Sequence, residues 1–544
     1  MKEPLHRMPA MTPPAGRAAT PSRFNVAALH RLAVVMLLGF ASGLPLALTG
    51  QAMQAWLSVE GVDVATIGFL SLVGLPYTFK FLWAPLMDRF ELPGLGRRRG
   101  WLVLTQLALA GALLWMAATS PTGATRGFAL VAVLVAFLSA SQDVVIDAYR
   151  TDLLAASERG LGASMGVLGY RLAMILSGGI ALIWVDPTQG GGWSWPSVYR
   201  FMAGVMVAAA CVSALALPKL PKLPSADGTA SVARRDVLGF LAVLLAVAFG
   251  VVVSDRLGPP IARVLMAPLF AGSTVAAPLQ AKWTDLAALV LGIAFTLPLA
   301  AWAARAARFE TLLSGLRSYF SQRGAAAFLA FIVLYKLGDV FAGSLMTPFL
   351  LQAMAYSTAE VGVVNKVIGL WLTIAGALIG GALMLRLGLW RALLIFGILQ
   401  MVSNLGFWWL AVNGRGVLPG LTIPAFDWGF VKLIHATPVD GGLLLVIACE
   451  NLASGMGTAA FVAFLMSLCN QRFTATQFAL LSAFASVGRV WVGPLAGVLA
   501  EAIGWPAFFI VSTLAALPAL VMLWWLRAPV RALEYDANAP LVDD

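Results

Sequence analysis

Long apolar stretches alternate with short polar turns along nearly the whole chain. Many of the stretches approach the ~20 residues that a helix needs to cross a bilayer. Their lengths predict roughly fourteen membrane-spanning helices. The first six are expected at Leu32–Gly50, Ile67–Met87, Trp101–Ala118, Gly127–Ala148, Gly162–Val185 and Val198–Leu217. Two further spans are expected at Leu238–Val253 and Leu286–Ala304, and the last six at Ala325–Ala353, Val361–Leu387, Ala392–Val412, Gly442–Leu468, Phe478–Ala500 and Pro506–Leu526.

Polar segments divide this series into parts. Pro218 to Arg235 combines proline with basic residues and has no long apolar run, which is typical of a linker. The Arg-bearing segment 305–323 is expected on the cytoplasmic membrane surface. The division that we expect is a disordered cytoplasmic tail over 1–30, a six-helix bundle over 31–217, a linker with two additional transmembrane helices over 218–324, a second six-helix bundle over 325–527, and a cytoplasmic tail over 528–544.

Composition supports an all-α integral membrane protein. The chain is 60% hydrophobic and 11% charged, whereas a soluble domain carries about 25% charged residues. A net charge of +11 would suggest a nucleic-acid partner in a soluble protein. Here the basic residues lie in short loops, where they set topology, so we expect a lipid bilayer and no nucleic acid as partner.

The distribution of charge predicts the orientation. Acidic residues mark the loops on one side, with Glu60, Asp63, Asp186, Glu360 and Glu501. The opposite loops are rich in arginine and lysine, and the positive-inside rule places them and both termini in the cytoplasm. The basic residues on that side include Arg31, Arg97, Arg98, Arg99, Arg150, Arg159, Lys219, Lys222, Arg234, Arg235, Arg386, Arg391, Arg472, Arg527 and Arg531.

An enzymatic function is not expected. The three histidines are scattered, and the sequence has no phosphate-binding P-loop, nucleophile elbow or metal-ligand spacing. No soluble stretch is long enough for a nucleotide-binding domain. Transport driven by an ion gradient, without a cofactor, is the class that remains, with a membrane-embedded receptor or lipid-processing protein as the alternative.

Acidic residues inside the spans are candidates for proton coupling. Asp143 and Asp147 are four residues apart and share one face of a helix. A carboxylate in a span is costly and usually faces a water-filled cavity or the protein interior. Burial favours its neutral form, so such a group can take up a proton. Asp143 is the first choice, Asp339 and Glu450 are further candidates, and Asp147 can instead belong to a gate.

Basic residues inside the spans are candidates for binding an anionic substrate. Lys80, Arg171, Lys336, Lys366 and Arg489 lie well within apolar runs. Arginine can hold a carboxylate with two parallel hydrogen bonds. The alternative is that each cation pairs with an internal carboxylate, and Lys336 with Asp339 is such a pair, three residues apart.

Neutral polar residues and one charged turn complete the candidates. Sugar recognition needs amides, hydroxyls and aromatic faces, which Gln51, Gln54, Gln142 and Tyr170 offer. Glycines at Gly39 and Gly43 allow close helix packing. The residues expected to form a gate on the cytoplasmic side are Asp88, Arg89, Arg97, Arg98 and Arg150.

Two sequence echoes suggest an internal duplication. Ala84-Pro-Leu-Met-Asp-Arg-Phe90 after the second span resembles Gly381-Ala-Leu-Met-Leu-Arg-Leu387 in the later half. Ala140-Ser141 with Arg159 recurs as Ala453-Ser454 with Arg472. Two six-helix halves with an acidic-basic turn after the second span resemble the major facilitator superfamily, whose motif has Gly where Ala84 stands.

Longer stretches resemble the AmpG family of muropeptide permeases. They are Leu38–Leu48, Phe79–Arg89, Gly96–Trp101, Ser139–Asp143 and Gly169–Arg171. The resemblance implies import of N-acetylglucosaminyl-1,6-anhydro-N-acetylmuramoyl peptides across the bacterial inner membrane, driven by protons, by a protein expected to be monomeric. A major facilitator for another peptide or saccharide is the alternative within transport.

Overall fold

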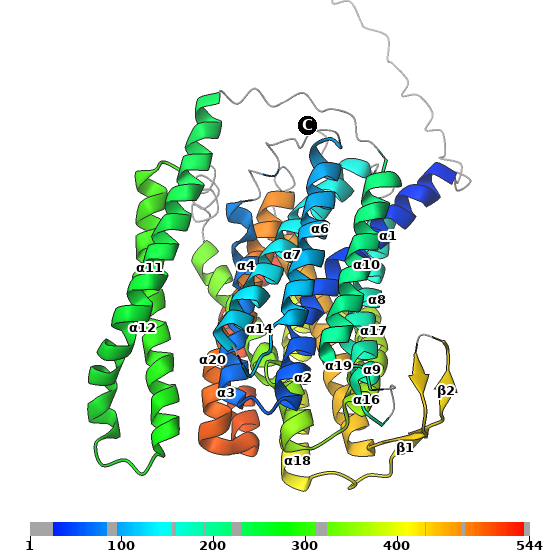
Figure 1. Ribbon diagram of the computed structural model, residues 1–544, viewed down its shortest axis with the longest axis vertical. Coiled ribbons are helices and arrows are strands. Elements are labelled where there is room, and N and C mark those ends of the chain that lie inside the picture. Colours follow the sequence, from blue (N-terminus) through cyan, green and yellow to red (C-terminus); the bar gives the residue numbers. More distant parts are fainter. Residues whose placement is uncertain are drawn as a thin grey trace, which may run out of the picture.

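Helices that run side by side dominate the computed structural model (Figure 1). It describes residues 26–83, 87, 95–123, 125–154, 159–188, 192–218, 230–309, 313, 324–429, 431–468 and 474–537. A helix satisfies its own backbone hydrogen bonds, as a segment in lipid must. Eleven helices of the described residues are long and apolar enough to cross a membrane, and Val64–Phe79 and Ala325–Gly338 are shorter apolar helices. The last long one, Trp491–Trp525, is interrupted at Gly504, where φ is 75°, so it comprises two helices. With this division, and with the two shorter helices counted as spans, the described residues contain the roughly fourteen spans that were expected.

The first group of helices covers the region before the linker. Its elements are α1 (Val26–Thr49), α2 (Gln51–Val59), α3 (Val64–Phe69), η1 (Leu70–Gly74), α4 (Leu75–Phe79), η2 (Lys80–Leu82), α6 (Arg97–Ala118), α7 (Thr125–Leu153), α8 (Arg159–Ile175), η4 (Leu176–Ile180), α9 (Ala181–Val185) and α10 (Trp195–Leu215). Within it α1 packs on α8, α4 on α7, and α6 on α10.

The second group follows the additional helices. Its elements are α14 (Ala325–Gly343), α15 (Met346–Pro348), η5 (Phe349–Ala353), α16 (Thr358–Val361), η6 (Gly362–Ile368), α17 (Gly369–Leu387), α18 (Leu389–Asn413), α19 (Gly441–Ser467), α20 (Thr474–Leu514), α21 (Leu517–Trp525) and α22 (Arg527–Ala537). Here α14 packs on α20, α17 on α19, and α18 on α21. In order of spans these are the same pairings as in the first group, as a duplicated bundle requires.

The two additional helices form a hairpin beside the bundle (Figure 1). They are α11 (Ala230–Phe270) and α12 (Ala277–Ala306), which pack on each other. Both are longer than the expected spans. In α11 the polar step Ser254-Asp255-Arg256 occupies only one helical turn. The helix continues beyond it through Pro259 and Pro260, which cannot donate a backbone hydrogen bond.

Four short strands between α18 and α19 were not predicted from the sequence. They are β1 (Leu421–Ile423), β2 (Phe426–Asp427), β3 (Lys432–Leu433) and β4 (Thr437–Val439), with β1 antiparallel to β4 and β2 to β3. We call the end of the bundle that carries these strands and the α2–α3 turn the ribbon end. The opposite end, where α6 begins and α10 ends, is the tail end (Figure 1).

The apolar cores of the two groups merge at one end only. The largest cluster of buried residues joins Trp56 and Phe128 of the first group to Phe349 and Phe508 of the second. Towards the tail end, one cluster around Tyr149 contains no residue of the second group, and another around Phe464 contains none of the first, among the described residues. The two groups are therefore joined by a common core at the ribbon end and have separate cores at the tail end.

Candidate functional site

Asp143 is held between α7 and α1. Ser42 Oγ donates a hydrogen bond of 2.6 Å to Asp143 Oδ1. The preceding residue, Gln142, is fully buried and donates from Nε2 to the Ala41 carbonyl at 2.7 Å. Neighbouring residues of α7 are thus tied to neighbouring residues of α1. Gln142 Oε1 is buried with no hydrogen-bond partner in the part of the chain that the structure describes, so it remains available for water or a ligand.

Asp147 lies one helical turn nearer the tail end, between two cations. Arg150 Nη2 donates to Asp147 Oδ1 at 3.0 Å, and Lys80 Nζ is 3.9 Å from Asp147 Oδ2. The side chains of Lys80 and Asp147 are 29% and 55% exposed. Arg150 thus pairs with Asp147, and for Lys80 the alternative of an internal ion pair is the arrangement observed. A role of Asp147 and Arg150 in a gate stays a prediction. A charged cluster within a span normally faces water or protein and not lipid.

Glycines bring α1 and α8 into backbone contact beside this cluster. A Cβ at Gly39 would lie 2.9 Å from the Gly166 carbonyl carbon, and one at Gly43 would lie 2.5 Å from the Tyr170 carbonyl oxygen. Both distances are too short for a side chain, so only glycine fits there. This close packing places the backbone of Tyr170 against the helix that carries Ser42.

Arg98 binds an aspartate that the sequence analysis did not single out. Its Nε lies 3.1 Å from Asp152 Oδ2 at the tail end of α7. Nearby, Arg99 donates to the Ala214 carbonyl and Tyr149 Oη donates to that of Pro218 at 2.9 Å. Of the other expected gate residues, Asp88, Arg89 and the side chain of Arg97 lie outside the described residues.

The second group contributes contacts of Lys336 and Glu450. Lys336 Nζ donates to Thr458 Oγ1 at 3.1 Å and lies 5.5 Å from the centre of the Phe461 ring. Asn451 Nδ2 donates to Glu450 Oε2 at 2.7 Å. The side chains of Asp339, Lys366 and Arg489 lie outside the described residues, so the Lys336–Asp339 pair stays a prediction.

At the ribbon end, Asp186 joins the two groups. It follows α9 and is 2% exposed. Its Oδ2 accepts from the Ala359 amide at 3.0 Å and from Thr358 Oγ1 at 3.1 Å, both at the start of α16, while Oδ1 accepts from the amide and hydroxyl of Thr188. Burial acts to raise the pKa of Asp186, but these hydrogen bonds outweigh it and hold the pKa below its usual value. The carboxylate is therefore ionised at neutral pH.

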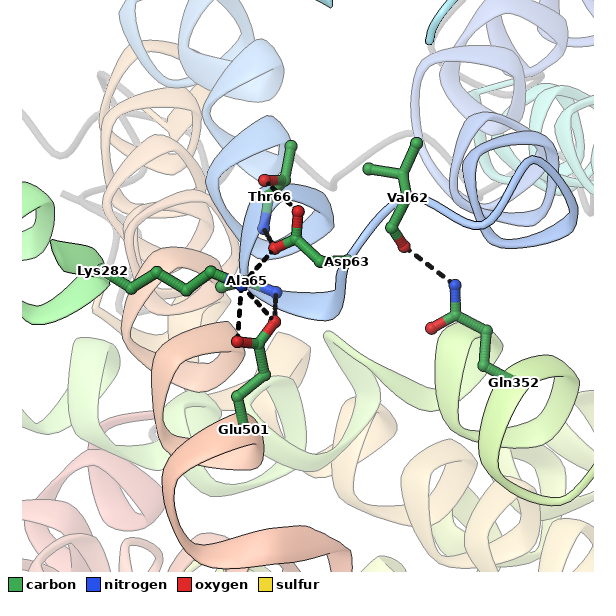
Figure 2. Close-up of polar contacts among 7 residues, drawn as sticks. All are labelled: Val62, Asp63, Ala65, Thr66, Lys282, Gln352 and Glu501. Atoms are coloured by element: carbon green, nitrogen blue, oxygen red, sulfur yellow. Dashed lines mark hydrogen bonds and ion pairs between the residues drawn. The ribbon is translucent and has the colours of Figure 1, made fainter. Parts of the chain in front are cut away.

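Glutamines add neutral links across the same interface. Gln352 Nε2 in η5 donates to the Val62 carbonyl at 2.9 Å (Figure 2). It also donates to the Ser58 carbonyl at 3.2 Å. Gln54 Nε2 in α2 donates to the Ser344 carbonyl at 3.0 Å. Gln54, predicted to contact sugar, thus bridges the groups in this conformation. The other expected amide, Gln51, has a buried Oε1 without a hydrogen-bond partner among the described residues.

A lysine of the additional hairpin completes the ribbon-end contacts. Lys282 Nζ in α12 lies 2.7 Å from Asp63 Oδ1 and 2.6 Å from Glu501 Oε2 (Figure 2). Burial acts to raise the pKa of Asp63, but hydrogen bonds from Lys282 and Thr66 outweigh it and lower the pKa. Sequence reasoning missed Lys282. The available signal was a lone lysine near the start of an apolar helix, on the side where the acidic loops lie.

Comparison with known proteins agrees with this architecture. The family model described as acetyl-coenzyme A transporter 1 matches residues 31–125. The anhydromuropeptide permease of Escherichia coli K12 is 42% identical over 505 residues, which are 93% of this chain and 81% of that protein. An uncharacterized protein of Haemophilus influenzae is 31% identical over 92% of this chain and 95% of its own length.

Solved structures support the fold. The POT family transporter PepTSo superimposes with a TM-score of 0.56 at 16% identity, covering 94% of this chain and 99% of that one. A bacterial homologue of the human lysosomal transporter Spinster, in an inward-facing and unoccupied conformation, gives 0.53 at 11% identity and covers 94% and 96%. At such identity these structures show the fold alone, and they confirm the major facilitator fold. With the sequence relatives, they show that the chain is a multi-pass membrane transporter that belongs to the anhydromuropeptide permease family.

Proposed function

We propose that this protein imports GlcNAc-1,6-anhydro-MurNAc peptides from the periplasm to the cytoplasm, in symport with protons. The proposed substrate is that named for the Escherichia coli permease, the anhydromuropeptide, because that protein is 42% identical over 93% of this chain. The mechanism is alternating access between the two helix groups. Import of such fragments would return them to the cell for reuse in the wall.

The observation that carries the mechanism is the asymmetry of the cores. One apolar cluster spans both groups at the ribbon end, while the tail-end clusters are separate among the described residues. A transporter closed on one side and separated on the other has this pattern. The arginine-rich loops belong to the tail end, so the positive-inside rule assigns that end to the cytoplasm and the ribbon end to the periplasm.

The charged cluster of α7 supports a coupled mechanism. Asp143 receives a hydrogen bond from Ser42 on α1, so its protonation state can influence how α1 and α7 fit together. Lys80 lies near Asp147, which is one helical turn from Asp143 on the same face of α7. An anionic substrate that binds Lys80 would weaken the cation's hold on these carboxylates and favour proton uptake. Substrate and proton would thus be linked through one shared cation.

Lysine and arginine side chains are the substrate contacts that we infer. Lys80 and Arg171 in the first group and Lys336 in the second present cations from three helices. Peptide carboxylates of the substrate would bind these groups, and the amides of Gln51 and Gln142 would accept hydrogen bonds from sugar hydroxyls.

Uptake into proteoliposomes tests the proposal. The purified protein is reconstituted and supplied with radiolabelled anhydromuropeptide, with and without an imposed inward proton gradient. We expect accumulation above the external concentration only with the gradient. Uptake that ignores the gradient would remove the symport claim. Uptake of unrelated sugars or peptides but not of anhydromuropeptide would indicate another substrate, and ligand binding without any uptake would indicate a receptor.

A further inference from the structure

The additional helix hairpin touches the bundle at the place where the two groups meet. α12 packs along α20 of the second group. At its ribbon end Lys282 reaches both Asp63, which precedes α3 of the first group, and Glu501 in α20 (Figure 2). Glu501 Oε1 also accepts from the Ala65 amide at 2.8 Å. Three separate parts of the chain therefore converge on one ammonium group and two carboxylates.

The backbones beneath this cluster are packed too tightly for side chains to interlock. A Cβ at Gly497 of α20 would lie 2.8 Å from Ala65 Cα, and one at Gly68 of α3 would lie 3.0 Å from Gly497 Cα. The interface between α3 and α20 is thus a smooth contact of small residues. The polar contacts of Asp63 and Glu501 with Lys282 lie at the edge of this interface.

Charge decides what those contacts do. Without Lys282, Asp63 and Glu501 would be two carboxylates drawn together across the interface, and like charges so placed repel. With Lys282 between them, the same two groups attract a common cation. Because α12 packs on α20, separation of α3 from α20 would stretch the Lys282–Asp63 contact first and leave Lys282 with Glu501.

We propose that Lys282 is a positioning residue for transport, which holds the periplasmic side closed by bridging Asp63 and Glu501, and that the additional hairpin serves to carry it. This rests on the proposed function for the assignment of the ribbon end to the periplasm. The hairpin then contributes, beside the two groups, to the closed contact at the ribbon end, and it sets how often the two groups separate there.

Labelling of a buried residue measures that opening. Ser58 is 6% exposed, and its carbonyl accepts from Gln352 across the interface. Ser58→Cys is placed in a chain whose Cys211, Cys449 and Cys469 are replaced by alanine. Its reaction with a membrane-impermeant maleimide is followed in right-side-out and in inverted vesicles.

We expect Lys282→Met to raise the labelling rate about fivefold in right-side-out vesicles. Exposed ion pairs contribute little stability, but loss of Lys282 also leaves the carboxylates of Asp63 and Glu501 to repel each other. Lys282→Arg should keep the original rate, and the swapped pair Lys282→Glu with Glu501→Lys should restore most of it. The matched control is Lys432→Met, which breaks an ion pair with Asp427 confined to the strands at the same end and should change nothing.

Two results would overturn the proposal. One is a labelling rate in Lys282→Met equal to that of the parent, and the other is the same acceleration in Lys432→Met. If Lys282→Met fails to fold, the rates of Lys282→Arg and the swapped pair decide, since neither should exceed the parent by more than about twofold. Labelling needs neither substrate nor protons, so a failure of muropeptide uptake leaves this test intact. Acceleration seen only in inverted vesicles would instead refute the orientation.

Discussion

Replacement of Asp186 by asparagine tests whether its hydrogen bonds to α16 hold the two groups together at the ribbon end and break when the groups separate there. Asp186 belongs to the first group, and the donors to its Oδ2, the Ala359 amide and the Thr358 hydroxyl, belong to the second. Asparagine preserves the size of the side chain but removes its charge. The bonds to Thr188 lie within the first group and persist when the groups separate, so only the two bonds across the interface bear on opening.

The magnitude follows from the strength of those two bonds. A neutral hydrogen bond contributes about 1 kcal/mol net, and one to a charged group about 1.5–3 kcal/mol. Neutralising the acceptor of both should therefore lower the free energy of opening by about 1–4 kcal/mol. A value of about 2 kcal/mol within that range makes the open state about 30 times more populated.

Hydrogen exchange at the start of α16 provides the assay. The Ala359 amide is protected by its bond to Asp186, so its exchange should accelerate by about 30-fold in Asp186→Asn in the regime where exchange follows the open population. Asp427→Asn is the matched control, because Asp427 is exposed on β2 at the same end and accepts from Lys432 and Gly429. Its effect on Ala359 should be negligible.

The pH dependence supplies an independent check. A carboxylate whose pKa is lowered by folding contributes stability above its unfolded pKa, and this is lost as pH falls through the folded value. For Asp186 that loss lies below the usual carboxylate range, so protection of Ala359, corrected for intrinsic exchange, should be constant from about pH 5 to 8. Unchanged exchange of the Ala359 amide in Asp186→Asn, or equal acceleration in Asp427→Asn, would refute the claim that Asp186 holds the two groups together at the ribbon end.

Three further substitutions address the pathway and the packing beside it. Asp143→Asn should abolish accumulation driven by a proton gradient but preserve exchange of labelled for unlabelled substrate, and normal accumulation would exclude Asp143 as the proton site. Gly43→Ala should lower stability by about 1–3 kcal/mol, seen as a fall in thermal midpoint, whereas Gly111→Ala should not, since a Cβ there meets nothing within 4 Å. Lys80→Met should raise the KM for muropeptide about tenfold, the order expected for one lost charged contact, and an unchanged KM would leave Lys80 only its ion pair with Asp147.

Hydropathy was sufficient to predict the helices because each span is a local property of the sequence. The lengths of the apolar runs predict the helices of the two halves and of the additional pair. The chain breaks at Gly50, between α1 and α2, and at Gly504, within α20, and neither break changes this prediction. The strands between α18 and α19 were missed because they are two or three residues long and have no periodic pattern. The helix α22 was missed because its apolar residues, such as the buried Val530, are spaced among charged ones.

The site could be predicted only in part. Spacing along one helix predicted that Asp143 and Asp147 share a face of α7, since four residues make about one turn. The Ser42–Asp143 bond joins residues 101 positions apart, and the Lys282 bridges join residues 219 apart. Such contacts depend on which helices pack together and on how far each is shifted along its axis relative to the other. A single sequence specifies neither. Residues that join the two groups at the ribbon end are therefore visible only in the folded chain.

Proton movement caused by the substrate is the most direct test of the central claim. Proteoliposomes containing the protein are loaded with a pH-sensitive dye and given anhydromuropeptide outside, with no gradient imposed. The account predicts that the lumen acidifies as labelled substrate enters, and that Asp143→Asn abolishes this acidification. Entry of the muropeptide with a constant internal pH would show that the two movements are not coupled and would contradict the account.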